Sequence, residues 1–158
     1  MIVVVMGVSG VGKTTIGEAL AGKLGWPFLD ADDYHPSANV AKMAAGTPLT
    51  DEDRWPWLDK LNSILRGERT AVVACSALKE SYRQRLTHGL PDYRVVYLYG
   101  TLELIASRLA ARRHRYMPAS LLESQFATLE PPAQAIPIDV AAPPSACVAA
   151  ILARLERR

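Results

Sequence analysis

Residues 2–15 read IVVVMGVSGVGKTT, and this stretch decides the fold. Its leading apolar residues predict a buried strand, and the GxxxxGKT pattern that follows predicts a tight loop leading into a helix. The glycines allow backbone N–H groups to turn toward a phosphate, beside the positive end of the helix dipole. Lys13 is expected to bridge the β- and γ-phosphates of a nucleoside triphosphate, and the Thr14 hydroxyl to hold Mg²⁺. A glycine-rich turn that binds nothing is disfavoured by this strand-to-helix context. The loop residues expected to bind the nucleotide are Gly7, Ser9, Gly10, Val11, Gly12, Lys13, Thr14 and Thr15.

Outward from this loop, short apolar runs alternate with helical patterns along the chain. The apolar runs predict strands at 2–6, 27–30, 70–75, 94–99 and 136–140. Helical spacing predicts helices at 13–24, 36–45, 51–66, 79–87, 101–114 and 120–127, and a last one from about 145. Pro56 must lie in the first turn of its helix or bend that helix. The alternation predicts an α/β fold, with a parallel sheet of about five strands covered on both faces and ligands at the carboxyl ends of the strands.

Size and composition fit one globular domain spanning 1–158. Apolar residues make up 49% of the 158 residues and charged residues 22%, which excludes a mainly disordered chain. The apolar run at 1–6 is too short to cross a membrane. Two distant cysteines match neither a disulfide framework nor zinc spacing, so we expect a cytoplasmic protein with no membrane partner.

Three acids, Asp30, Asp32 and Asp33, follow the second predicted strand. They should therefore emerge at the same sheet edge as the phosphate loop. In an extended chain, alternation places Asp30 and Asp32 on one side and Asp33 on the other. Asp30 is then suited to the outer shell of the metal, and Asp32 to orienting an attacking hydroxyl and accepting its proton. A solvated acidic turn is the alternative.

Arginines gather near residue 110. Arg108 and Arg112 lie one helical turn apart on one face of the predicted helix. A mobile segment carrying them could fold over the triphosphate, with Arg112 stabilising charge in the transition state and Arg108 lying against adenine. A solvated helix end is the alternative. A nucleic-acid surface is disfavoured, because the net charge is only +2 and no nucleic-acid-binding module accompanies the run.

Beyond the phosphate loop, the sequence resembles the gluconokinases, in the shikimate-kinase-like branch of P-loop kinases. The resemblance covers nearly the whole chain and is carried by DADDYHP at 30–36, PLTDEDRWPWL at 48–58, CSALK at 75–79 and LLESQF at 121–126, with Asn39, Lys42, Met43, Gly46, Tyr82, Arg83, Met117 and Pro118. It implies a three-layer P-loop kinase fold with a helical substrate lobe at about 35–60 and a lid at about 110–127. One departure lies in the lid, where HRY at 114–116 replaces the Gly-His-aromatic run expected of the family.

The resemblance also implies an activity: ATP- and Mg²⁺-dependent phosphorylation of D-gluconate at its 6-hydroxyl, by a protein that is often a homodimer. Arg54, Lys79 and Arg83 are then candidates to bind the substrate carboxylate, while His35 and Asn39 read sugar hydroxyls. Asp32 is expected both to bind the substrate and to act in catalysis. The other expected catalytic residues are Lys13 and Arg112. A similar kinase for another small sugar acid or anion, and a non-enzymatic nucleotide switch, are the alternatives.

Overall fold

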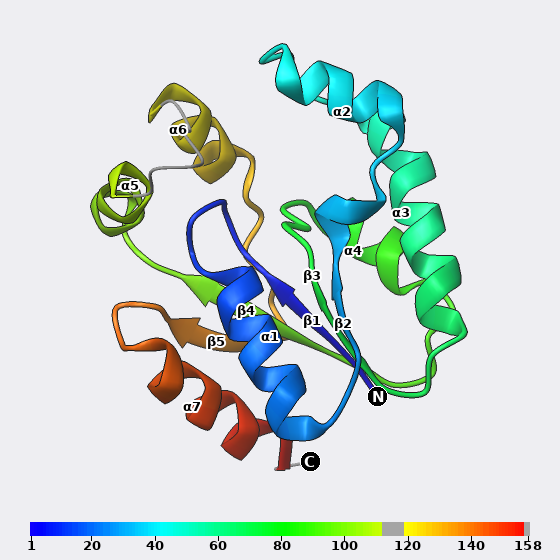
Figure 1. Ribbon diagram of the computed structural model, residues 1–158, viewed down its shortest axis with the longest axis vertical. Coiled ribbons are helices and arrows are strands. Elements are labelled where there is room, and N and C mark those ends of the chain that lie inside the picture. Colours follow the sequence, from blue (N-terminus) through cyan, green and yellow to red (C-terminus); the bar gives the residue numbers. More distant parts are fainter. Residues whose placement is uncertain (112–118, 157–158) are drawn as a thin grey trace.

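The protein is built on one five-stranded sheet, seen in a computed structural model that describes residues 1–111 and 119–156 (Figure 1). The strand order is β2-β3-β1-β4-β5, and every neighbouring pair is parallel. This confirms the predicted α/β fold with a parallel sheet, and the strands agree with the predicted ranges to within one or two residues. The strands are β1 (Ile2–Met6), β2 (Phe28–Asp30), β3 (Ala71–Ala74), β4 (Tyr93–Tyr99) and β5 (Ile136–Asp139).

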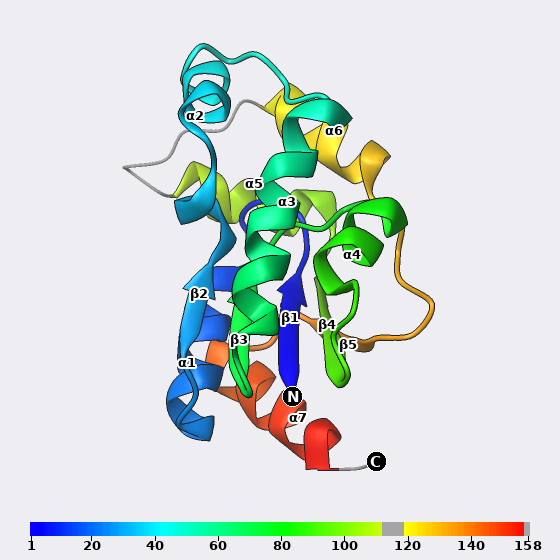
Figure 2. The same cartoon turned by 90° about the vertical axis from the view of Figure 1, so that its right-hand side faces the viewer.

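Helices cover both faces of the sheet, because β1 is apolar on both of its sides. Val3 and Val5 pack in one core cluster with α1 (Lys13–Leu24) and α7 (Pro144–Glu156), whereas Val4 packs in a second cluster with α3 (Asp51–Arg66) and α4 (Glu80–Thr87). Figure 2 views the molecule from the α3 and α4 side. Two-sided burial of this kind is what parallel strands require.

The remaining helices stand beyond the carboxyl ends of the strands. These are the 3₁₀ turn η1 (Ala31–Tyr34), α2 (Ser37–Ala44), α5 (Leu102–Ala110) and α6 (Ala119–Thr128). In both views α2 and α6 lie at the end of the molecule toward which β1 points (Figures 1 and 2). The phosphate loop and the expected substrate residues are therefore at the same end of the sheet. No helix in the described parts of the chain is long and apolar enough to cross a membrane.

Some helix boundaries differ from the prediction. Pro56 is the sixth residue of α3, so the first of the two predicted alternatives, a first-turn position, is excluded and a bend stays a prediction; its missing N–H leaves the Glu52 carbonyl without a helical donor. A capping box formed by Thr50 and Asp53 begins this helix. Helix α5 is described to Ala110, and the predicted helical residues 112–114 lie outside the described residues; α6 begins at Ala119, one residue before its predicted start.

Candidate active site

The phosphate loop connects β1 to α1 in a conformation that requires glycine. At Gly10 φ is +89°, and a Cβ there would lie 2.8 Å from Leu109 Cγ. At Gly7 a Cβ would lie 2.6 Å from the Leu98 carbonyl oxygen. Helix α1 has Gly12 at its N-cap, with neither a side-chain cap nor an acid in its first turn. Its first N–H groups are therefore open to an anion at the positive end of the helix dipole.

Lys13 lies against this loop. Its Nζ donates to the carbonyl oxygens of Gly7 at 3.0 Å and Val8 at 3.1 Å, so the ammonium group is held beside the N–H groups that would surround a phosphate. The predicted contact of Lys13 with the β- and γ-phosphates stays a prediction.

Thr14 and Asp30, the two residues predicted to serve a metal, are brought together. The Thr14 hydroxyl donates to Asp30 Oδ2 at 3.2 Å, although the residues are far apart in sequence. Mg²⁺ prefers hard oxygen ligands and usually completes its shell with phosphate oxygens and water. A hydroxyl on the phosphate loop beside one carboxylate fits such an ion.

The acids after β2 do not follow the predicted extended alternation. Asp30 Oδ1 accepts the backbone N–H of Asp32, which caps η1 and turns the chain at once. The prediction that Asp30 and Asp32 share one side of an extended chain is therefore wrong, because side-chain capping favours a turn over a strand. Asp32 projects into solvent with 70% of its side chain exposed, and its Oδ1 lies 3.8 Å from His35 Nε2.

His35 is held rigidly next to Asp32. Its side chain is 4% exposed and stacks on Trp57, with ring centroids 4.0 Å apart. The Asn39 amide nitrogen donates to the Asp53 carbonyl at 2.9 Å and lies 3.2 Å from His35 Nδ1. We assign His35 Nδ1 as the acceptor of that amide, which leaves the ring proton on Nε2, facing Asp32.

Burial lowers the pKa of His35; Asp32 opposes this shift and Arg54 adds to it. A lowered pKa keeps the imidazole neutral near pH 7, in agreement with the assigned tautomer. Asn39 is buried and its amide nitrogen has internal partners, so its contacts orient His35. This pair was expected to read sugar hydroxyls, and the geometry favours a supporting role for Asn39.

A cationic cluster forms where α3 meets α4. Arg54 Nη1 and Lys79 Nζ lie 4.0 and 3.8 Å from Asp51 Oδ1, and both cations stand over the ring of Tyr82. The Tyr82 hydroxyl donates to Asp51 at 2.5 Å, and burial together with this bond raises the pKa of Tyr82 to about 12. Two of the three predicted carboxylate ligands are thus adjacent. Tyr82 was identified only as part of the family resemblance.

Arg83, the third predicted carboxylate ligand, is 5% exposed and differently engaged. Its Nε and Nη2 donate to Glu80, its Nη1 to the carbonyls of Ala77 and Leu78, and its Nη2 also to the carbonyl of Glu130. Every guanidinium nitrogen therefore has a protein acceptor. The geometry favours a structural role for Arg83, which joins the loop before α4 to the segment after α6.

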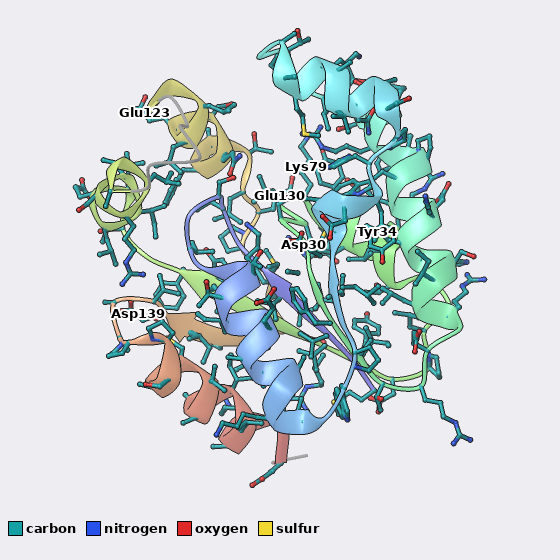
Figure 3. The ribbon with its side chains drawn as sticks, viewed as in Figure 1. Asp30, Tyr34, Lys79, Glu123, Glu130 and Asp139 are labelled. Carbon is teal, nitrogen blue, oxygen red and sulfur yellow. The ribbon has the colours of Figure 1, made fainter. Side chains whose placement is uncertain are left out.

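Two cavities of about 670 and 530 Å³ lie along α4, and neither is lined by a phosphate-loop residue. The larger includes Tyr93 at the amino end of β4 and Arg154 near the end of α7. The candidate site lies at the carboxyl ends of the strands, where Figure 3 shows Asp30, Lys79 and Glu130 projecting from their elements.

Comparison with known proteins agrees with this geometry. A protein family described as "AAA domain" matches residues 2–132. A probable gluconokinase of Xenopus tropicalis is 45% identical, and the match covers 100% of this chain and 95% of the relative. The crystal structure of a gluconokinase from Sinorhizobium meliloti superposes with a TM-score of 0.92 at 45% identity, over 98% of this chain and 91% of the other.

The chain belongs to the gluconokinase family. A shikimate kinase from Aquifex aeolicus shares the fold, with a TM-score of 0.65 at 18% identity over 99% of this chain and 96% of that one. Both the family resemblance and the P-loop kinase fold predicted from the sequence are confirmed.

In this gluconokinase-family chain, the predicted lid is described only in part. Arg108 lies in α5, partly exposed, and its charge lowers the pKa of Cys147 in α7, although burial and Asp139 raise that pKa on balance. Arg108 therefore lies close enough to α7 to influence Cys147, and its expected contact with adenine stays a prediction. Arg112 and the departure at 114–116 lie outside the described residues.

Gln125 of α6 was not predicted as a site residue. Its Oε1 accepts the Ser9 N–H at 2.8 Å, and its Nε2 donates to Ser9 Oγ at 3.1 Å. The available signal was its position in the LLESQF stretch that carries the family resemblance. Spacing along the chain gave no indication of this contact, because it joins residues 116 positions apart.

Proposed function

We propose that this protein is an ATP-dependent kinase that phosphorylates D-gluconate at its 6-hydroxyl, giving 6-phospho-D-gluconate and ADP. The observation that carries the proposal is the adjacent pair Arg54 and Lys79, at the same end of the sheet as a complete phosphate loop. The relatives named above as gluconokinases support the choice of a sugar acid over a neutral sugar.

ATP is proposed to bind along Gly7–Thr15, with Arg108 beside the adenine. Backbone N–H groups at the start of α1 and the Lys13 ammonium would contact the β- and γ-phosphates. Thr14 would hold Mg²⁺, with Asp30 in the outer shell of the ion, since the Thr14 hydroxyl is hydrogen-bonded to the Asp30 carboxylate. When bound, Mg²⁺ neutralises charge on the phosphate oxygens.

The gluconate carboxylate is proposed to bind Arg54 and Lys79. Asp51 now lies between these two cations, and with Tyr82 it fixes their positions. A substrate carboxylate would add a second anion to two cations that one carboxylate does not fully neutralise. Arg83 is left out of the proposed contacts, because its donors are bonded internally.

Asp32 is proposed to orient the 6-hydroxyl and accept its proton. The loose transition state of phosphoryl transfer asks little of a base early, so orientation is its main contribution. His35, with Nε2–H facing Asp32, would keep that carboxylate directed toward the acceptor. Arg112, proposed on the sequence pattern, would stabilise charge on the transferred group together with Lys13.

The proposal also includes a single kinase domain with a substrate lobe at about 35–60 and a lid at about 110–127. The protein is proposed to be a homodimer and to be located in the cytoplasm. Both cysteines are free and buried, which suits a reducing compartment. Sedimentation velocity of the purified chain tests the dimer.

The experiment that tests the function is an ADP-release assay across D-gluconate, other aldonates, glucose and shikimate. Gluconate should exceed glucose by roughly 10²-fold or more in kcat/KM, since glucose leaves the cationic pair without its carboxylate. Two-dimensional NMR of the product should show phosphorus coupled to the C6 protons. Equal rates with glucose would contradict the proposed carboxylate recognition, and a faster aldonate would reassign the substrate.

A further inference from the structure

Gln125 connects α6 to the phosphate loop through both ends of its carboxamide. Ser9 supplies a backbone N–H to Oε1 and a hydroxyl oxygen to Nε2, at 2.8 and 3.1 Å. Because one bond is accepted and the other donated, the orientation of the amide is fixed. The side chain is partly buried in this contact.

Five residues later, Glu130 binds the loop that carries Lys79. The Glu130 N–H donates to the Leu78 carbonyl at 2.8 Å, and its Oε1 accepts the Glu80 N–H at 2.9 Å. Arg83 adds a bond to the Glu130 carbonyl at 2.8 Å. Residues 125–130 therefore span from the nucleotide loop to the loop of a proposed carboxylate ligand.

The chemistry of the contact suits a site that receives phosphate. Ser9 precedes Gly10. The positive φ of Gly10 and its close packing on Leu109 leave the loop few alternative backbone conformations. A neutral carboxamide can satisfy the Ser9 N–H without placing a negative charge beside the triphosphate, whereas a carboxylate would repel it. Binding Ser9 also limits the motion of the loop before the nucleotide arrives, so less ordering remains to oppose binding.

We propose that Gln125 is a positioning residue for phosphoryl transfer: through Ser9 it holds the phosphate loop in its nucleotide-binding conformation and in register with the loop that carries Lys79. The inference rests on the proposed kinase function. It concerns the nucleotide side of the site, which can be measured without any sugar acid.

The test is a double-mutant cycle on the full chain, with Gln125→Met and Ser9→Ala. Methionine keeps the length and helix propensity of glutamine and removes both hydrogen bonds. We expect Gln125→Met to weaken MgATP binding, measured by calorimetry without sugar acid, by ~10-fold, and to lower kcat by a similar factor. The KM for gluconate should stay within about twofold, and Ser9→Ala should cost less in the Gln125→Met background than alone.

The matched control is Ser124→Ala, at an exposed neighbour on the same helix; MgATP affinity should be unchanged there. Nucleotide affinity of Gln125→Met within twofold of the parent would overturn the inference, as would strictly additive effects in the cycle. A lower unfolding temperature with unchanged nucleotide affinity would assign Gln125 a purely structural role. If Gln125→Met weakens MgATP binding as expected but the parent protein does not phosphorylate gluconate, the role of Gln125 stands and only the proposed substrate is contradicted.

Discussion

Asp30 and Asp32 are separated by a single residue, yet their carboxylates have different surroundings. Asp30 is bonded to the Thr14 hydroxyl and to the backbone of η1, so it cannot turn toward an acceptor without breaking both contacts. Asp32 extends into solvent beside the fixed imidazole of His35. Side-chain position, more than residue type, thus favours Asp30 for the metal and Asp32 for the hydroxyl.

Asparagine at each position separates these roles. Asp32→Asn should lower kcat by ~10²-fold or more with nucleotide affinity nearly intact, since it keeps the shape and removes the proton acceptor. Asp30→Asn should instead raise the Mg²⁺ concentration needed for half-maximal rate. Initial rates across a Mg²⁺ titration measure both; rescue of Asp32→Asn by excess Mg²⁺, without rescue of Asp30→Asn, would reverse the assignment.

Arg54 and Arg83 offer a matched pair of arginines with opposite expected phenotypes. Arg54→Ala should raise the gluconate KM by ~10-fold or more while the ATP KM stays nearly constant, because one carboxylate ligand is lost. Arg83→Met should lower the unfolding temperature, because buried carbonyls of Ala77 and Leu78 lose their donor.

Steady-state kinetics and thermal unfolding of both variants check this contrast. An Arg54→Ala enzyme with lower thermal stability and an unaltered gluconate KM would instead make Arg54 a structural residue.

At the scale of elements, α2 and α3 are joined through one carboxylate. Asp53 accepts from Lys42 Nζ at 2.7 Å and from the Thr50 N–H at 2.9 Å, and these bonds, with that to Lys42 the largest cause, lower the pKa of Asp53 to about 2. It also presents its carbonyl to Asn39, so the start of α3 fixes the residues around His35. The Thr50 cap therefore stabilises both the helix and the proposed substrate lobe.

This carboxylate predicts a pH dependence of stability. Its pKa is lower in the folded chain than the ordinary value of 3.8, so the unfolded state binds more protons as the medium is acidified. The stabilisation is present above about pH 4 and is lost as pH falls toward 2. Asp53→Asn should unfold at a lower temperature than the parent at pH 7, and the difference should shrink between pH 4 and 2.

Differential scanning fluorimetry of both proteins across that pH range measures the effect. Because other acids titrate in the same range, the quantity to compare is the difference between variant and parent. A difference that stays constant from pH 7 to 2 would contradict the role of Asp53.

At the scale of the whole molecule, the sheet brings distant segments to one end. The phosphate loop, η1, the loop before α4 and α6 all meet beyond the carboxyl ends of the strands (Figures 1 and 2). Direct contacts join them: Thr14 to Asp30, Ser9 to Gln125, and Glu80 to Glu130. Ligands that bind these segments should therefore stabilise the chain as a unit.

Ligand-dependent melting follows from this. MgATP at 100 times its dissociation constant should add about 2.7 kcal/mol to the free energy of unfolding. In a chain of this length that corresponds to roughly 5–11 °C in unfolding temperature. Gluconate should raise the unfolding temperature as well, and glucose should not. Melting curves at graded ligand concentrations check this, and an equal shift with glucose would contradict carboxylate recognition.

Features that depend only on neighbouring residues could be predicted from the amino-acid sequence. The phosphate loop, the alternation of apolar strands with helices, and the extent of α3 are local patterns, because backbone conformation and hydrophobic periodicity act over a few positions. Asp30 could be proposed as a site residue from its place at the end of a predicted strand, and Arg54 and Lys79 from the family resemblance.

The different surroundings of Arg54 and Arg83, and the contact between Gln125 and the phosphate loop, could be known only from the three-dimensional structure. Arg54 and Arg83 are chemically identical in the sequence, and the bonds of Arg83 to Glu80, to Glu130 and to the carbonyls of Ala77 and Leu78 favour a structural role for it. Gln125 meets Ser9 across 116 positions through the closing of the sheet. Such contacts depend on how whole helices and strands pack against one another. That packing is the sum of many weak interactions between distant residues, so a short stretch of sequence does not specify it.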